Sequence, residues 1–506
     1  MKKRILTVIA AFTILSMSVS CGDDFVDRQQ PYSIDSENYF NSEDDYQQAL
    51  IAVYDILQPS YQNVLLGEIA SDNTLAGGES ATDVPGFQQV DDMTHTPINP
   101  EVKKIWDWMF AGINRANYIL EFKDKTDFEG KEHILAQTRF LRAYFHFELV
   151  KWFGGVPMKG DARFKLGDET TIQRSSAEEV YAAIEADLLY AIENINTGVP
   201  AQQGRVTKGA AQALLGKVYL YWADLGNGHP TKFADAANVL ESLISSNAYS
   251  LVTDYSTIFE NNNENNAESV FEIQYSDGEG GSFECLQCSE GNIAVGFNGP
   301  RGYNGPFFES GYSFNVPTQE AYDMFESGDM RKDIAILNIQ AIVDAYPNWN
   351  NGTGVQYGQG YEHTGFYNRK YIPRVGDLNP QDPNLTNPNN YRAIRYADVL
   401  LMAAEAYNRG NIDDTRAQMY LNMVIRRAYG NNLHDVTETD SNLTELIWQE
   451  RRKELVGEGH RFFDLVRTKR AAGTIPGFIT NKHELFPIPF EEIQFSNNLW
   501  QQNPGY

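Results

Sequence analysis

The sequence predicts a mainly α-helical protein, in which paired helices form a scaffold, long irregular loops interrupt it and a few short strands join it. Amphipathic runs at helical spacing fill the first half of the chain and return in its last quarter. Between them, residues 253–390 lose this periodicity and gather Gly, Asn, Pro and aromatic residues. One stretch near the start of that segment, residues 269–275, alternates like a short strand.

The N-terminus has the pattern of a secretory signal. Three cationic residues precede an apolar stretch that is too short to span a bilayer, which predicts a signal peptide over residues 1–20. Small residues precede Cys21, as in the lipobox of proteins that are acylated on such a cysteine. We therefore expect residues 21–35 to hold the lipidated cysteine and a tether. An ordinary secretory signal followed by a coincidental cysteine is the alternative.

Charge and cysteine content exclude several classes of protein. The formal net charge of −27 repels nucleic acid, so a nucleic-acid partner is not expected. Asp23 and Asp24, which lie just after Cys21-Gly22, resemble the signal that sends lipoproteins of Bacteroidetes to the cell surface, while a solvated tether is the alternative. Only Cys285 and Cys288 remain after Cys21, which is too few for a disulfide scaffold. A local disulfide or free thiols are both open for this pair, and a redox or zinc role is disfavoured.

The first helical part is expected over residues 36–252. Ser42 and Ser176 each begin a capping box, and Pro59 should end the helix that starts at Ser42. Further helices are predicted over residues 103–123, 133–152 and 177–192.

Two later segments indicate repeated helix pairs. Residues 215–219 match the L-G-x-x-Y pattern of a tetratricopeptide helix. Residues 404–420 show a similar pattern of small and aromatic residues with wider spacing. Small residues at helix crossings allow close packing, so we expect irregular helical hairpins that stack as a scaffold.

The C-terminal part, residues 391–506, carries motifs in a fixed order. The motifs are YRAIRYADVLLMAAEA at 391–406, YLNMVIRRAYG at 420–430, ERRKELVGEGHRFFDLVR at 450–467 and LFPIP at 485–489. Together they resemble the SusD/RagB family of nutrient-uptake outer-membrane lipoproteins. Charged residues along 450–467 are expected to pair within one helix, and Arg395 is expected to pair with Asp398 on one helical turn. Ile425 stands where the family usually has Arg.

The resemblance implies both a fold and a function. The family fold has four tetratricopeptide-like helix pairs, and its members have no catalytic residues and need no cofactor. They capture oligosaccharides, or peptides in some cases, as the lid of a SusC-like TonB-dependent transporter in the outer membrane. We therefore expect a cell-surface glycan-binding lipoprotein, with a peptide-capturing lid as the first alternative.

Ligand contacts are expected in the loops of residues 253–390, because long loops on a rigid scaffold often carry binding residues. Sugar faces pack on aromatic rings, while their hydroxyl groups need polar partners. The last group below rests on no motif. It is taken from the early region in which the family often places polar ligand contacts. The candidates are Trp349, then Tyr303, Phe307, Phe308 and Tyr312, and finally Asp72 and Asn73. The alternatives are a simple loop anchor for Trp349 and a satellite hydrophobic cluster for the second group.

A surface glycoside hydrolase is the second alternative. Carboxylates are abundant, so a catalytic pair would arise by chance and the sequence offers no way to select it. No H-E-x-x-H, G-x-S-x-G or Walker A motif is present. The asparagine-rich run at residues 261–264 lacks EF-hand spacing, so no metal site is predicted there.

Overall fold

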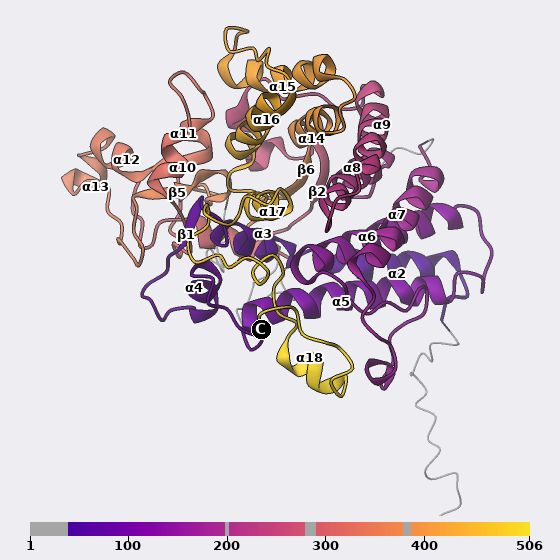
Figure 1. The fold of residues 1–506 in the computed structure, drawn as a ribbon. Helices are drawn as coiled ribbons and strands as arrows, with labels where there is room; N and C mark the ends of the chain where they lie inside the picture. Colours follow the sequence, from indigo (N-terminus) through magenta and orange to yellow (C-terminus); the bar gives the residue numbers. More distant parts are fainter. Residues whose placement is uncertain (1–38, 198–201, 279–289, 378–385) are drawn as a thin grey trace, which may run out of the picture.

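A computed structural model describes residues 39–197, 202–278, 290–377 and 386–506. The predicted signal peptide, Cys21 and the Cys285–Cys288 pair lie outside these ranges. The predicted mainly α-helical fold is confirmed: helices α5 to α9 each contact the next one along the chain, α9 contacts α14, and α14 packs on α15 and α16 (Figure 1). The long helices are α2 (Glu43–Asp55), α5 (Pro100–Glu121), α6 (Lys131–Phe153), α7 (Ala177–Asn194), α8 (Lys208–Asp224), α9 (Thr231–Ser245), α14 (Tyr396–Arg409), α15 (Asp414–Tyr429) and α16 (Asp440–Leu455).

Local sequence explains where the helices begin. Ser42 and Ser176 both form the predicted capping boxes, with side chains that accept from the backbone N–H three residues on. The first helix ends at Asp55, and Pro59 precedes a second helix, α3 (Ser60–Ile69).

Small residues let the helices approach closely. A Cβ atom on Gly216 of α8 would lie 2.4 Å from the side chain of Leu240 on α9. A Cβ atom on Gly112 of α5 would lie 2.5 Å from the ring of Phe145 on α6. The glycines thus set the spacing of the helix pairs, and one continuous hydrophobic core runs from Phe40 to Trp500.

In the part of the chain that the structure describes, three two-stranded antiparallel sheets join distant segments. β1 (Thr74–Ala76) pairs with β3 (Asn315–Pro317), β2 (Ser269–Ile273) with β6 (Tyr391–Arg395), and β4 (Ile336–Asn338) with β5 (Phe366–Asn368). The predicted strand at residues 269–275 is therefore present and slightly shorter. The division of the chain at residues 252 and 390 stays a prediction.

Short elements fill the loop-rich part and the C-terminus. In Figure 1 the helices α10 to α13 protrude on the side away from α7 to α9. The remaining helices are α4 (Pro85–Asp91), α10 (Gln319–Asp323), α11 (Lys332–Ala335), α12 (Ile339–Ala345), α13 (Trp349–Gly352), α17 (Arg461–Arg467) and α18 (Phe490–Phe495).

The expectation of one helix along residues 450–467 is wrong. Helix α16 ends at Leu455 and α17 starts at Arg461, because Gly457 and Gly459 take φ angles of +84° and +81°. A side chain at Gly459 would place its Cβ atom 2.9 Å from the Cα atom of Val64. This turn redirects the charged residues toward other segments of the chain.

The C-terminal residues dock onto the helices. The side-chain amide of Asn503 donates to the carbonyl oxygens of Phe153 (3.0 Å) and Phe486 (2.6 Å). The indole N–H of Trp500 donates to the carbonyl oxygen of Ile172 at 2.8 Å.

Candidate functional site

Residues 290–377 of the loop-rich part, here called the loop lobe, contain a separate hydrophobic cluster. Tyr303 and Phe308 are buried in this cluster, and Trp349 packs against it with its side chain partly exposed. Three of the candidate aromatic residues are therefore brought together. The other buried members are Leu337, Ile339, Val355, Tyr367 and Ile372.

Two aromatic side chains stand on the surface of this lobe. Phe307 is 51% exposed and Tyr346 is 36% exposed. Their ring centroids lie 5.5 Å apart at 77°, and the backbone N–H of Trp349 donates to the carbonyl oxygen of Tyr346 at 3.2 Å. We call Phe307, Tyr346 and Trp349 the aromatic platform. The sequence analysis missed Tyr346, although an aromatic residue directly before Pro347 in the same loop was a usable signal.

The backbone of the platform is held in an uncommon conformation. Phe307 has a φ angle of +76°, which is costly for a residue with a bulky side chain. The Tyr303 hydroxyl donates to the carbonyl oxygen of Pro306 at 2.6 Å, and burial raises the pKa of this phenol to about 12. The guanidinium groups of Arg369 and Arg374 both lie 5.8 Å from the ring centroid of Phe308. Tyr303 and Phe308 thus support the exposed ring of Phe307.

Tyr312 lies where the loop lobe meets an early loop. Its carbonyl oxygen accepts from Arg301 at 2.9 Å, and the same guanidinium pairs with Asp83 at 3.0 Å. The backbone N–H of Tyr361 donates to the carbonyl oxygen of Gly78 at 2.8 Å. The early loop of residues 77–83 therefore joins the lobe that carries the platform.

Asp72 and Asn73 take part in polar contacts inside the protein. The carboxylate of Asp72 pairs with Arg461 (2.7 Å) and Arg452 (3.0 Å). Burial alone would raise the pKa of Asp72, but these two guanidinium groups keep it below its usual value. Asn73 is fully buried and accepts from Arg452 at 2.8 Å. A ligand contact by either residue stays a prediction, as it does for the aromatic candidates.

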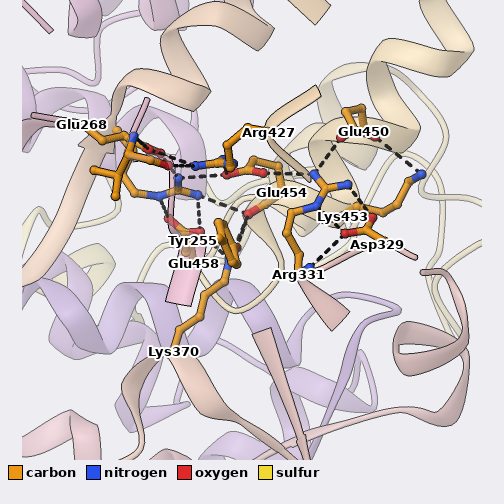
Figure 2. Close-up of polar contacts among 12 residues, drawn as sticks. Tyr255, Glu268, Asp329, Arg331, Lys370, Arg427, Glu450, Lys453, Glu454 and Glu458 are labelled. Carbon is orange, nitrogen blue, oxygen red and sulfur yellow. Dashed lines mark hydrogen bonds and ion pairs between the residues drawn. The ribbon is translucent and has the colours of Figure 1, made fainter. Parts of the chain in front are cut away.

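A buried network of ion pairs, here called the charge network, joins the loop lobe to the C-terminal helices (Figure 2). Glu454 lies at its centre and contacts Arg427 (2.6 Å), Arg395 (3.0 Å) and Arg331 (3.0 Å). Burial would raise the pKa of Glu454, but the three guanidinium groups hold it well below its usual range. The network contains equal numbers of cations and carboxylates, the others being Lys370, Lys453, Glu268, Asp329, Glu450 and Glu458.

This arrangement corrects the expected pairing within the C-terminal motifs. Arg395 pairs with Glu268, Glu454 and Glu458 at 2.6–3.0 Å. Asp398 instead pairs with Lys217 (2.8 Å) and Arg451 (2.7 Å). Lys453 does pair with Glu450 within helix α16 at 3.5 Å, and Arg467 pairs with Asp464 within α17 at 2.8 Å, but most of the other contacts join segments far apart in sequence. The charged motifs therefore have a structural role between segments.

The described residues also limit the chemistry of the site. Across residues 39–197, 202–278, 290–377 and 386–506, no group of three or more His, Cys, Asp or Glu side chains is arranged to hold a metal ion. Within the same ranges, none of the helices combines the length and the apolar character of a membrane span.

Comparisons with known proteins agree with the C-terminal motifs and the fold. The model of the SusD family matches residues 256–484, and a model described as "Starch-binding associating with outer membrane" matches residues 24–220. A solved structure named "Laminarin binding SusD-like protein" is 33% identical, covers 92% of this chain and 100% of its own, and superposes with a TM-score of 0.81. The chain belongs to the SusD family.

Other known proteins are similar to this chain over most of their length. Surface glycan-binding protein A from Bacteroides thetaiotaomicron, solved in complex with laminarihexaose, is 27% identical over 91% of this chain and 99% of its own, with a TM-score of 0.81. SusD-like protein P2 from Formosa agariphila is 27% identical over 83% of both chains. The family resemblance inferred from the motifs is thus confirmed.

Proposed function

We propose that this SusD-family protein captures an oligosaccharide on the cell surface, without catalysis, and acts as the lid of a SusC-like TonB-dependent transporter in the outer membrane. The observation that carries the proposal is the 33% identity, over 92% of the chain, to a structure named as laminarin binding. The complex of a second relative with laminarihexaose supports the same class of ligand. Cys21 would supply the lipid anchor, as its sequence context indicates.

The aromatic platform is our proposed contact surface. Phe307 and Tyr346 present ring faces and edges to solvent on the loop lobe, which suits packing against the C–H groups of a sugar. Trp349 borders them, and the amide side chains of Asn348 and Asn350 are exposed on either side of it. These amides supply donors and acceptors for hydroxyl groups.

Calorimetric titration of the chain without its first 21 residues tests the proposal. We expect binding of laminarihexaose, and a loss of about three- to tenfold in affinity for Phe307→Ala or Tyr346→Ala, since an aromatic contact contributes roughly 0.5–1.5 kcal/mol. Phe495→Ala is the matched control, because this phenylalanine is 61% exposed on α18, apart from α12 and α13 in Figure 1. Maltohexaose and cellohexaose test the preference for linkage.

Each other result has a distinct meaning. Equal affinity of Phe307→Ala, Tyr346→Ala and Phe495→Ala would contradict the platform but leave glycan capture intact. Heat on addition of a peptide digest, with no response to any sugar, would favour the peptide-capturing lid. Shortening of laminarihexaose during the titration would favour a glycoside hydrolase.

A further inference from the structure

A large pocket lies on the helical scaffold, far from the aromatic platform. It has a volume of about 780 Å³, which is within the range of small-molecule sites. It lies where the start of α8 meets α2, α6, the end of α7 and the end of α9. In Figure 1 these helices are on the opposite side of the molecule from α12 and α13. We call it the scaffold pocket.

The lining of the scaffold pocket is rich in amides and hydroxyl groups. Gln137 and Gln212 line it from α6 and α8, and Tyr249 presents an aromatic ring with a hydroxyl group. Further amides and hydroxyl groups come from Gln47, Asn196, Thr197, Gln202, Thr207 and Ser246. Such groups can both donate and accept, which suits a ligand with many hydroxyl groups.

The charge of the pocket is opposite to that of the chain. The chain has a net charge of −27, but none of the described residues that line the pocket is Asp or Glu. Two of the lining residues, Arg205 and Lys208, are cationic. One terminal nitrogen of Arg205 is buried and has no hydrogen-bond partner among the described residues. Lys208 is exposed at the start of α8, where the helix dipole also favours an anion.

The walls of the pocket are fixed by hydrogen bonds. The Tyr54 hydroxyl donates to Gln137 at 2.8 Å and accepts from the backbone N–H of Val206 at 2.9 Å, and the Arg205 guanidinium lies 4.8 Å from the centroid of the same ring. Thr207 and Tyr249 are joined by their hydroxyl groups at 3.0 Å. The polar groups are thus held in place before a ligand arrives, which reduces the entropy lost on binding.

We infer that the scaffold pocket is a second binding site of this protein, for an anionic saccharide. A carboxylate or a sulfate ester of the sugar pairs with Arg205 and Lys208, and its hydroxyl groups bond with the amides of the lining. The inference does not depend on the aromatic platform, since the two sites share no residue.

The test uses calorimetric titration of the same soluble chain with trigalacturonate and, in a second arm, with neocarrabiose 4-sulfate. We expect binding in at least one arm, weaker binding at high salt, and no measurable binding of the neutral trisaccharide maltotriose. Binding in one arm only identifies the preferred anion. Arg205→Gln should weaken binding by about tenfold or more, because a charge-assisted contact is lost.

Lys208→Gln keeps the test valid if Arg205→Gln disturbs the packing on Tyr54, since Lys208 is exposed and should cause a smaller loss of affinity. Lys165→Gln is the matched control, because this lysine is 63% exposed and does not line the pocket. Absence of binding in both arms would overturn the inference. So would affinity that is unchanged in Arg205→Gln and Lys208→Gln, equal binding of maltotriose, or loss of binding in Phe307→Ala.

Discussion

Replacement of Glu454 by Gln should cause one of the largest losses of stability available from a single polar substitution in this protein. The variant removes one negative charge and leaves Arg331, Arg395 and Arg427 buried with too few carboxylates. Removal of one member of a buried ion pair costs about 3–5 kcal/mol. The entropy of unfolding of a chain of this size is about 1 kcal/mol per kelvin, so the melting temperature should fall by roughly 3–5 °C.

Thermal unfolding followed by circular dichroism measures this change, with Glu445→Gln as the matched control. Glu445 lies on the same helix, α16, but its side chain is 56% exposed and its partner Arg470 is 3.9 Å away. The control should lose no more than about 1 kcal/mol, as is usual for exposed ion pairs. Melting temperatures of the two variants that agree within 1 °C, as an order-of-magnitude criterion, would refute the assignment of a structural role to the charge network.

Two further predictions concern a buried carboxyl group and the lipid anchor. Burial raises the pKa of Glu68 to about 7, against the opposing N–H groups of Gly459 and Gly457, so the folded protein keeps a proton that the unfolded chain has lost. The free energy of unfolding should therefore fall from pH 5 to pH 8 by up to about 3 kcal/mol more in the wild type than in Glu68→Gln. Urea unfolding at each pH measures this, and the same change with pH in both proteins would contradict the reasoning. In cells, the wild type should co-sediment with the outer membrane and co-purify with a TonB-dependent barrel, while Cys21→Ser should be released, and an unchanged distribution of Cys21→Ser would argue against acylation of this cysteine.

Much of the fold could be predicted because its signals are local. The capping boxes at Ser42 and Ser176 fix where two helices begin, through hydrogen bonds between residues only three apart in sequence. Both capping boxes are present, as predicted. The pairing of Arg395 with Asp398 was predicted wrongly. Helical spacing identifies neighbours on the same turn, but it carries no information about partners elsewhere in the chain. The actual partner Glu268 is far away in the chain and comes near only through the pairing of β2 with β6.

The candidate site was only partly accessible for the same reason. Composition located the aromatic loops, but sequence could not separate Phe307, which is exposed, from Phe308, which is buried beside it. That difference follows from the positive φ of Phe307 and from packing against β4 and β5, which are properties of the folded lobe. Tyr346 was missed because its position next to Phe307 depends on two loops meeting in space.

The charge network also constrains the order in which the chain can fold as it appears from its N-terminus onward. Arg331, Lys370 and Arg395 appear before Glu454 and Glu458, which are among their carboxylate partners. Until helix α16 and Glu458 follow, the earlier cations have at most Asp329 and Glu268 as carboxylate partners, so their desolvation carries a large energetic cost. We therefore expect burial of these cations between the loop lobe and the C-terminal helices to be a late event that follows the appearance of helix α16. A fragment that ends before Glu454 should therefore be unable to complete this fold.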